Sequence, residues 1–138
     1  MRGALSIGAA GVAIALCGCG GVKAPDLFIV YRSGSTSQAK LTLLVDEEGG
    51  VTCNGRAAAS KLEDAKIVKA REIQEELEKP SSSHLSLAPR AGSVLSYYVR
   101  DESGSVRFSD NSAAQPAVFR KLQLFVLQTA QQICGLSG

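Results

Sequence analysis

The chain has 138 residues, with 15 Lys and Arg against 13 Asp and Glu, which gives a formal net charge of +2. This near balance offers no broad basic surface for a nucleic-acid backbone. With no Trp, three Tyr and four Phe, base-stacking platforms are not expected either. A chain of this length has room for one domain with a single hydrophobic core. We therefore expect one small domain with no nucleic-acid partner.

The first 18 residues have the pattern of an export signal. Arg2 places a positive charge at the start, and residues 3–16 are small and apolar. This stretch is shorter than the roughly 20 strongly apolar residues that a membrane-spanning helix needs. An uncleaved signal anchor is the alternative, since residues 3–22 carry no charge. Six glycines in that stretch speak against the anchor, because they lower both hydrophobicity and helix propensity.

The sequence Leu16-Cys17-Gly18-Cys19 resembles the lipobox of bacterial lipoproteins. Cys17 does not fit as the modified residue, because Leu16 stands directly before it, where the motif has a small side chain. Cys19 fits, and the resemblance implies that its thiol takes a diacylglycerol, that the signal is cleaved before it, and that its new amine is acylated. Two or more acyl chains would anchor the protein stably, at the extracytoplasmic face of the cell membrane. The expected organisation is a signal peptide at 1–18, a lipidated cysteine with a short tether at 19–26, and a single domain at 27–138.

Two further cysteines, Cys53 and Cys134, lie in the expected domain. An exported chain meets oxidising conditions, in which an even pair of cysteines usually closes a disulfide. The bridge would close a loop of about 80 residues and contribute roughly 4 kcal/mol to stability on the chain-entropy account. Two buried free thiols are the alternative.

Three strands are predicted in the first part of the domain. Residues 27–31 form a β-branched and aromatic run that ends at a turn-prone Ser-Gly-Ser sequence. Residues 40–46 alternate in polarity, so that one face carries Leu41, Leu43 and Val45. A turn at 47–50 leads into residues 51–53, because glycine supplies the positive φ that such turns need.

A charged helix is predicted next. Its start is ambiguous, because Ser60-x-x-Glu63 has the capping-box pattern and Asp64 is a second candidate cap. The helix would run from 61 or 64 to Lys79, where Pro80 would end it. Most of its surface is charged, and its narrow apolar stripe consists of Ile67, Ala70, Ile73 and Leu77.

The last part of the chain predicts a hairpin and a second helix. Strands over 94–100 and 106–109 would be joined by a type I turn with Gly104 in the left-handed position. Pro116 suits the first position of the final helix, which would run to Ile133 with Gly135 as its cap. The predicted fold class is α+β in the order βββαββα. It has a mainly antiparallel sheet of about five strands, with the long C-terminal helix packed on one face.

No catalytic, metal or cofactor site can be assembled from the sequence. His84 is the single histidine and lies in a polar loop after Ser81-Ser82-Ser83, without the features of an activated nucleophile. A solvated loop residue is its expected role. The acidic groups Asp46-Glu47-Glu48 and Asp101-Glu102 fall on turns and lack the spacing of a calcium loop. We expect a protein that is not an enzyme and that has no cofactor, no metal and no small-molecule substrate.

The chain resembles the emfourin family, small proteins that inhibit thermolysin-type metallopeptidases, over about residues 27–134. The resemblance rests on an opening strand that ends in Arg32-Ser33-Gly34, on a central helix followed by a Tyr-containing hairpin, and on Asp110 before a proline-initiated helix. It implies the α+β fold and a role as a peptidase inhibitor. The chain departs from the family in its lipobox, its cysteine pair and its Gly49-Gly50 hairpin.

Two functions are therefore open. In the first, the protein is a membrane-anchored, non-enzymatic binding module or peptidase inhibitor, which meets a protein partner through the loop at 81–90 and through Arg32, Ser33, Gly34 and Ser35. In the second, it is an accessory envelope lipoprotein that contacts another membrane protein through the charged helix at 61–79. Polar loops rich in Gly and Ser, without a catalytic set, favour the first.

Overall fold

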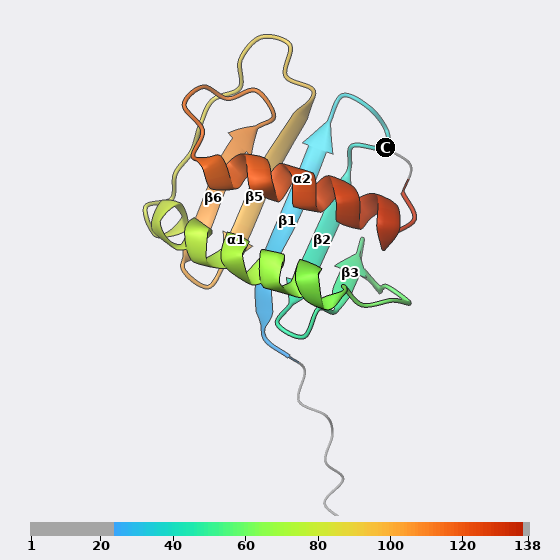
Figure 1. Cartoon of the computed structure of the whole chain (residues 1–138). Helices are drawn as coiled ribbons and strands as arrows, with labels where there is room; N and C mark the ends of the chain where they lie inside the picture. Colours follow the sequence, from blue (N-terminus) through green and yellow to red (C-terminus); the bar gives the residue numbers. More distant parts are fainter. Residues whose placement is uncertain (1–23, 137–138) are drawn as a thin grey trace, which may run out of the picture.

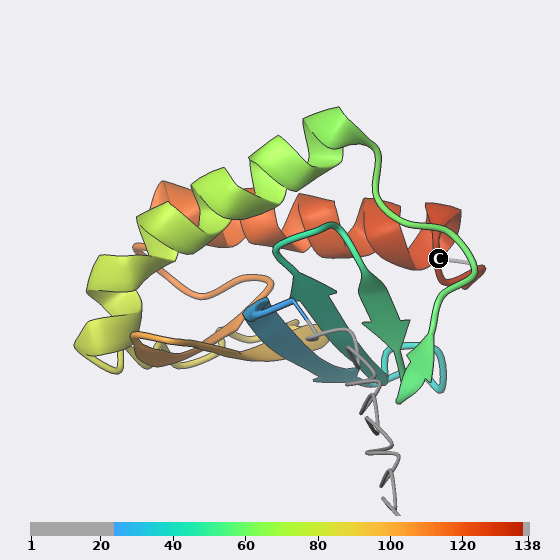
Figure 2. The same cartoon turned by 90° about the horizontal axis from the view of Figure 1, so that it is seen from below.

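The computed structural model describes residues 24–136. The expected signal peptide at 1–18 and Cys19 lie outside these residues, as does most of the tether. The described part is an α+β fold, in which one antiparallel sheet carries both helices on the same face (Figures 1 and 2). Within residues 24–136, neither helix has the length and apolar character needed to cross a membrane.

The sheet contains six strands in the order β4-β3-β2-β1-β5-β6, and all neighbours are antiparallel. The strands are β1 Asp26–Gly34, β2 Leu41–Asp46, β3 Val51–Cys53, β4 Arg56–Ala57, β5 Leu95–Asp101 and β6 Gly104–Ser109; the helices are α1 Asp64–Ser82 and α2 Ala117–Gln132. The predicted fold class is confirmed, and β4 adds one strand to it. It follows a tight turn in which Asn54 and Gly55 have φ of 51° and 82°, a geometry that suits a two-residue hairpin.

The hydrophobic core lies between the sheet and the two helices (Figure 2). Burial alternates along β2, where Leu41, Leu43 and Val45 face the helices and are buried, as predicted. The apolar stripe predicted for α1 and the buried side of α2 close the core from the other side. Because α1 and α2 cover the same face, the opposite face of the sheet has no helix over it.

An aromatic stack joins the sheet to α2. The rings of Tyr97 and Phe108 have their centroids 5.0 Å apart, and those of Phe108 and Phe119 lie 4.1 Å apart. A second pair, Phe28 and Phe125, meets edge to face at 5.9 Å. Such pairs add about 0.5–1.5 kcal/mol beyond area burial. They therefore fix α2 over β1, β5 and β6.

The caps of the helices differ in part from the predictions. Glu63 precedes α1 as its N-cap residue and makes no side-chain cap hydrogen bond, so the capping box from Ser60 does not form and the helix begins at Asp64. Pro116 is the N-cap residue of α2 rather than its first helical residue. Gly135 adopts φ +67° just after α2, which confirms the predicted glycine cap.

The end of α1 corrects the prediction. Pro80 lies inside the helix, which continues to Ser82. A contact with β5 stabilises the last turn of α1, because the fully buried Ser81 donates its hydroxyl hydrogen to Asp101 Oδ2 at 2.7 Å. Gly104, in the turn that Asp101 caps, has φ +153° rather than the predicted left-handed helical value. A Cβ at this position would lie 2.3 Å from the Ser81 carbonyl oxygen, so the absence of a side chain lets α1 approach the turn.

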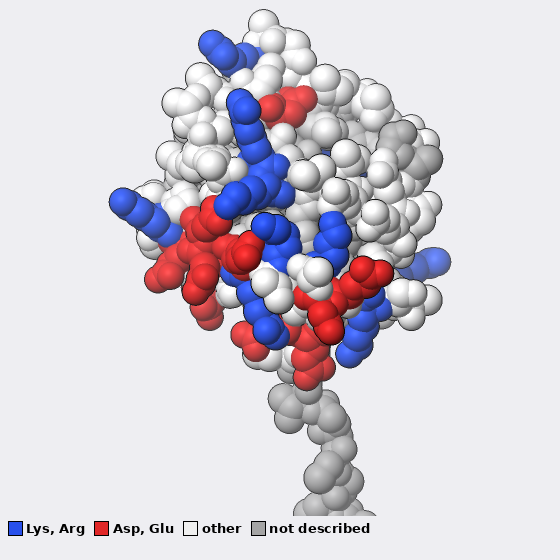
Figure 3. Space-filling model, viewed as in Figure 1, with Lys and Arg blue, Asp and Glu red and all other residues white. Residues whose placement is uncertain are grey.

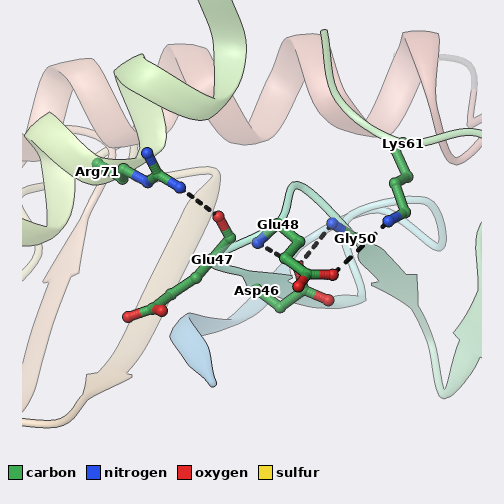
Figure 4. A network of polar contacts seen from close by, with 6 residues as sticks. All are labelled: Asp46, Glu47, Glu48, Gly50, Lys61 and Arg71. Atoms are coloured by element: carbon green, nitrogen blue, oxygen red, sulfur yellow. Dashed lines mark hydrogen bonds and ion pairs between the residues drawn. The ribbon is translucent and has the colours of Figure 1, made fainter. Parts of the chain in front are cut away.

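The predicted acidic turn between β2 and β3 is a structural feature (Figure 4). Asp46 Oδ1 accepts hydrogen bonds from the backbone amides of Glu48, at 2.9 Å, and of Gly50, at 2.8 Å. Arg71 of α1 donates from Nη2 to the carbonyl oxygen of Glu47 at 2.7 Å. The turn thus closes the hairpin and fastens α1 to the end of the sheet.

Cys53 and Cys134 lie at disulfide distance, as predicted, with their sulfur atoms 2.01 Å apart and their Cα atoms 5.9 Å apart. The pair joins β3 to the segment that follows α2, across 81 positions of sequence. The bridge therefore holds the C-terminal end of α2 against the β3 side of the sheet.

Candidate functional site

The uncovered face of the sheet carries a concave surface of about 960 Å³ at the end where β1 finishes. We call it the sheet groove. Its floor is formed by β1, β2, β5 and β6, and its rims by the β1–β2 loop and the segment after α1. The residues that line it are 31–34, 36, 37, 40–42, 86–89, 96–98 and 107–109.

The centre of the floor combines two tyrosines with an arginine. Tyr31 and Tyr98 are direct cross-strand partners, and their rings stack with centroids 5.7 Å apart. Arg107, the partner of Tyr98 on β6, places its guanidinium carbon 4.0 Å from the centroid of the Tyr98 ring. Stacked aromatic and cationic groups on a surface offer contact area at little entropic cost. This set was not identified from the sequence, because the pairing of Tyr31 with Tyr98 depends on the register between β1 and β5.

One rim is formed by the end of β1 and the β1–β2 loop. The predicted contact residues lie here: β1 continues past the expected turn to Gly34, so Ser33 and Gly34 end the strand and Ser35 begins the loop. Ser33, Gly34 and Ser35 are exposed. Gly34 packs so closely against β5 that a Cβ there would lie 2.3 Å from the Val94 carbonyl oxygen. The end of β1 thus needs glycine at this position to stay close to the start of β5.

Arg32 has a different place from its predicted neighbours. It is only 9% exposed. Its guanidinium donates from Nε to the Ala39 carbonyl oxygen at 2.8 Å and from Nη2 to the Gln38 carbonyl oxygen at 3.2 Å. Arg32 therefore braces the β1–β2 loop from beneath and does not project from the rim as Ser33 does.

The segment after α1 forms the second rim. Its predicted polar loop runs beside the outer edge of β6, where Ser86 forms a parallel bridge with Arg107. The Arg107 amide donates to the Leu85 carbonyl at 2.9 Å, and the Leu87 amide donates to the Arg107 carbonyl at 2.8 Å. Residues 86–89 of the predicted contact loop at 81–90 line the groove, whereas Ser81 is buried within α1. Parts of the two regions that the sequence proposed separately as contacts therefore border one surface. His84 is exposed, as predicted, and does not line the groove.

Charge is distributed unevenly between the two ends of the sheet. Lys40 and Arg107 are exposed in the groove, and its lining contains no Asp or Glu. At the opposite end, where β1 begins, Asp26 and Asp46 lie opposite each other on neighbouring strands. The acidic β5–β6 turn lies at the same end. The groove is thus a locally cationic surface on a nearly neutral chain.

Tyr97 lies under the groove, and burial raises the pKa of its hydroxyl. The positive charge of Arg32 opposes this rise in pKa, and the carboxylate of Asp110 adds to it. Among residues 24–136, no group of three or more His, Cys, Asp or Glu side chains is placed to hold a metal ion.

A second surface of interest is the outer side of α1, over which charged side chains gather (Figure 3). Lys69 bonds Glu72 at 2.8 Å within the helix, and Lys121 of α2 bonds Glu76 at 2.6 Å. The hydrogen bond between Lys69 and Glu72 raises the pKa of Lys69 and lowers that of Glu72. These pairs are exposed, and solvent screens them.

No protein-family model matches the chain, and no curated protein or solved structure is significantly similar to it.

Proposed function

We propose that this protein is a membrane-anchored, extracytoplasmic lipoprotein that binds a protein partner through the sheet groove and performs no catalysis. One observation carries the proposal: the two candidate loops meet on one concave surface with an aromatic and cationic floor. Rigid strands support that floor, so the partner meets a preformed site, which lowers the entropic cost of binding.

The occupant that best fits the groove is an extended, acidic segment of a partner protein. Lys40 and Arg107 would face its carboxylates, and the exposed hydroxyls of Ser33 and Thr36 would accept or donate hydrogen bonds. Charge complementarity of this kind steers association and selects partners. The specific version of the proposal is inhibition of a thermolysin-type metallopeptidase, which rests on the emfourin resemblance.

The position of the groove suits a short lipid tether at Cys19. The chain enters the domain at Asp26, while the groove lies at the other end of the nine-residue strand β1. At about 3.3 Å per residue this separation is roughly 25–30 Å. The groove would point away from the bilayer, toward proteins in the extracytoplasmic space rather than toward lipid.

Titration of the full chain in lipid nanodiscs tests the binding step. The probes are a Glu-rich extended peptide and a Lys-rich peptide of the same length. We expect the acidic peptide to bind and Tyr98→Ala and Arg107→Ser each to weaken it roughly tenfold. Lys69→Ser, on the far side of the molecule, is the matched loss of a surface cation and should leave the affinity unchanged. Equal affinity for both peptides would remove the groove proposal.

The inhibitor version has its own assay. The full chain in nanodiscs is added to a thermolysin-type peptidase, and cleavage of a peptide substrate is followed. Slowing at micromolar concentration that Tyr98→Ala relieves supports inhibition through the groove. Unchanged cleavage at that concentration leaves binding as the function and removes inhibition. Intact mass of the protein isolated from membranes tests the anchor, through loss of residues 1–18 and gain of acyl chains at Cys19.

The alternative role, as an accessory envelope lipoprotein that contacts a membrane protein through α1, is favoured by the charged outer surface of that helix (Figure 3). Charge reversal at Lys69 and Glu72 together would preserve their mutual attraction while inverting the surface pattern. Loss of a co-purified membrane protein in this variant, with retention in Tyr98→Ala, would assign the contact to α1 instead of the groove.

A further inference from the structure

Arg32 is a buried cation whose charge is not neutralised by a carboxylate. It is 9% exposed, and its guanidinium bonds the two backbone carbonyls of Gln38 and Ala39. No Asp or Glu of residues 24–136 lies within ion-pair distance of it. Asp110 is engaged elsewhere, with Ser93 Oγ at 2.9 Å and the Val94 amide at 3.1 Å. A buried charge without a counter-charge is costly, so this site favours an anion.

Arg32 also lines a second pocket, on the helix side of the sheet, which shares Arg32, Thr36 and Ser37 with the sheet groove. This Arg32 pocket has a volume of about 490 Å³ and lies between the β1–β2 loop, the start of β5 and α2. Ligand pockets commonly measure about 300–1,000 Å³. A guanidinium has five N–H donors, and the two loop carbonyls use two of them.

The other wall of the Arg32 pocket is apolar and exposed. Val94 is 47% exposed and Leu127 of α2 is 41% exposed, and both line the pocket. They come from segments more than thirty positions apart, so the tertiary fold brings them beside Arg32. Exposed large aliphatic side chains next to a buried cation match a ligand that carries an apolar group and a negative charge together.

We propose that the Arg32 pocket binds a carboxylate attached to an apolar group, as in the C-terminal residue of a polypeptide that ends in Leu or Val. The carboxylate bonds the free donors of Arg32, and the apolar group rests on Val94 and Leu127. Arg–carboxylate pairs are charge-assisted and favour two parallel hydrogen bonds. A medium-chain fatty acid has the same chemistry and is the second possible source. Its apolar contacts, Val94 and Leu127, lie outside the lining of the sheet groove, so the two sites can be tested separately.

Calorimetric titration of the full chain in nanodiscs tests this site with N-acetyl-Ala-Leu bearing a free carboxylate, with its C-terminal amide, and with octanoate. We expect saturable binding of the free acid and at least tenfold weaker binding of the amide. Tighter binding of the peptide than of octanoate identifies a polypeptide end as the source, and the reverse order identifies a fatty acid. Binding of the amide as tight as that of the acid overturns the proposal.

Two exposed leucines of α2 supply a matched pair of variants. Leu127 lines the pocket, whereas Leu124 is 55% exposed and does not. Leu127→Ser should weaken the acid about fivefold, since part of the apolar contact is lost, and Leu124→Ser should not. If Leu124→Ser or Tyr98→Ala weakens binding of the acid as much as Leu127→Ser does, the acid binds elsewhere and the assignment is overturned.

Substitution of Arg32 affects folding as well as binding, because its guanidinium also bonds the β1–β2 loop. Arg32→Lys keeps the charge and loses the fork of donors, so the acid should bind at least tenfold more weakly while thermal unfolding shows a folded protein. If this variant does not fold, a peptide whose last residue carries a photoreactive diazirine locates the site in the unaltered chain. Cross-links at Val94 or Leu127 support the pocket, and cross-links confined to the sheet groove contradict it.

Discussion

The two faces of the sheet are built from the same alternating strands and have different tasks. On the covered face, aliphatic and aromatic side chains such as Leu43, Val99 and Phe108 are almost wholly buried. On the uncovered face, the intervening positions carry Tyr31, Tyr98, Arg107 and several hydroxyls, partly open to solvent. Stability is therefore concentrated on the covered face, which leaves the uncovered face free to change for binding.

The largest effect is expected from truncation of the aromatic stack. Phe119 is fully buried and its ring lies 4.1 Å from that of Phe108. Phe119→Ala should lower the free energy of unfolding by about 3–5 kcal/mol, because the cavity persists in a packed core. Tyr31→Ala, on the uncovered face, is the control and should cost less than about 1 kcal/mol. Urea denaturation of both variants measures the contrast, and similar losses would contradict the division between the faces.

Opening the Cys53–Cys134 bridge should have the next largest effect. The bridge spans 81 positions and holds the end of α2 to β3. Its reduction, or the double change Cys53→Ser with Cys134→Ser, should lower the free energy of unfolding by about 4 kcal/mol, chiefly by freeing the unfolded chain. The uncovered face should keep its geometry in the reduced protein. Reduced affinity of the sheet groove at temperatures where the protein stays folded would show that the two faces are coupled.

A smaller effect is expected at the β5–β6 turn, which contacts the C-terminal end of α1. Asp101 accepts hydrogen bonds from the buried hydroxyl of Ser81 and from two backbone amides. Asp101→Ala should cost about 1–3 kcal/mol, because it leaves a buried donor without a partner. Asp46→Ala removes a similar pair of amide contacts without a buried hydroxyl, and so should cost less. Thermal unfolding of the two variants measures the difference. An equal loss of stability would show that the hydrogen bond between Ser81 and Asp101 does not stabilise the fold.

The smallest expected effect concerns alkaline pH. Burial raises the pKa of Tyr97 above its ordinary value of 10.0, so the folded state keeps this hydroxyl protonated where the unfolded state loses the proton. The contribution is fully present below pH 10 and is lost as pH rises through the higher pKa of the folded state. Tyr97→Phe should therefore show a shallower fall in unfolding free energy between pH 9 and 11. Tyr31→Phe is the exposed control and should follow the unaltered protein.

Much of the fold could be predicted because its signals are local. Alternation along 40–46 identifies the buried face of β2, and the spacing of Val118, Phe119 and Leu122 identifies that of α2. The end of α1 could not be predicted, since Pro80 normally stops a helix. The last turn is stabilised by the long-range contact between Ser81 and Asp101, which no local pattern announces. The short strand β4 was missed because a two-residue strand has no pattern of its own.

The candidate site was predictable only in part. The Gly- and Ser-rich composition pointed to the β1–β2 loop and to the segment after α1, and both border the sheet groove. The tyrosines and Arg107 that form its floor gave no signal, because alternation alone does not say which face of a strand will be covered. Arg32 belongs to the same predicted motif as Ser33 but points to the other side of the sheet, where it borders a second pocket.

The amino-acid sequence predicted the α+β class, the succession of strands and helices except for β4, the buried faces of β2, α1 and α2, and a bridge between Cys53 and Cys134 as the favoured of two alternatives. Periodicity and turn chemistry act over a few residues, so they can be read without knowing the fold. The tertiary structure alone decided that both helices share one face, that Tyr31, Tyr98 and Arg107 meet on the other, and that Arg32 and Leu127 border one pocket. These arrangements depend on how whole elements pack, which no local pattern specifies.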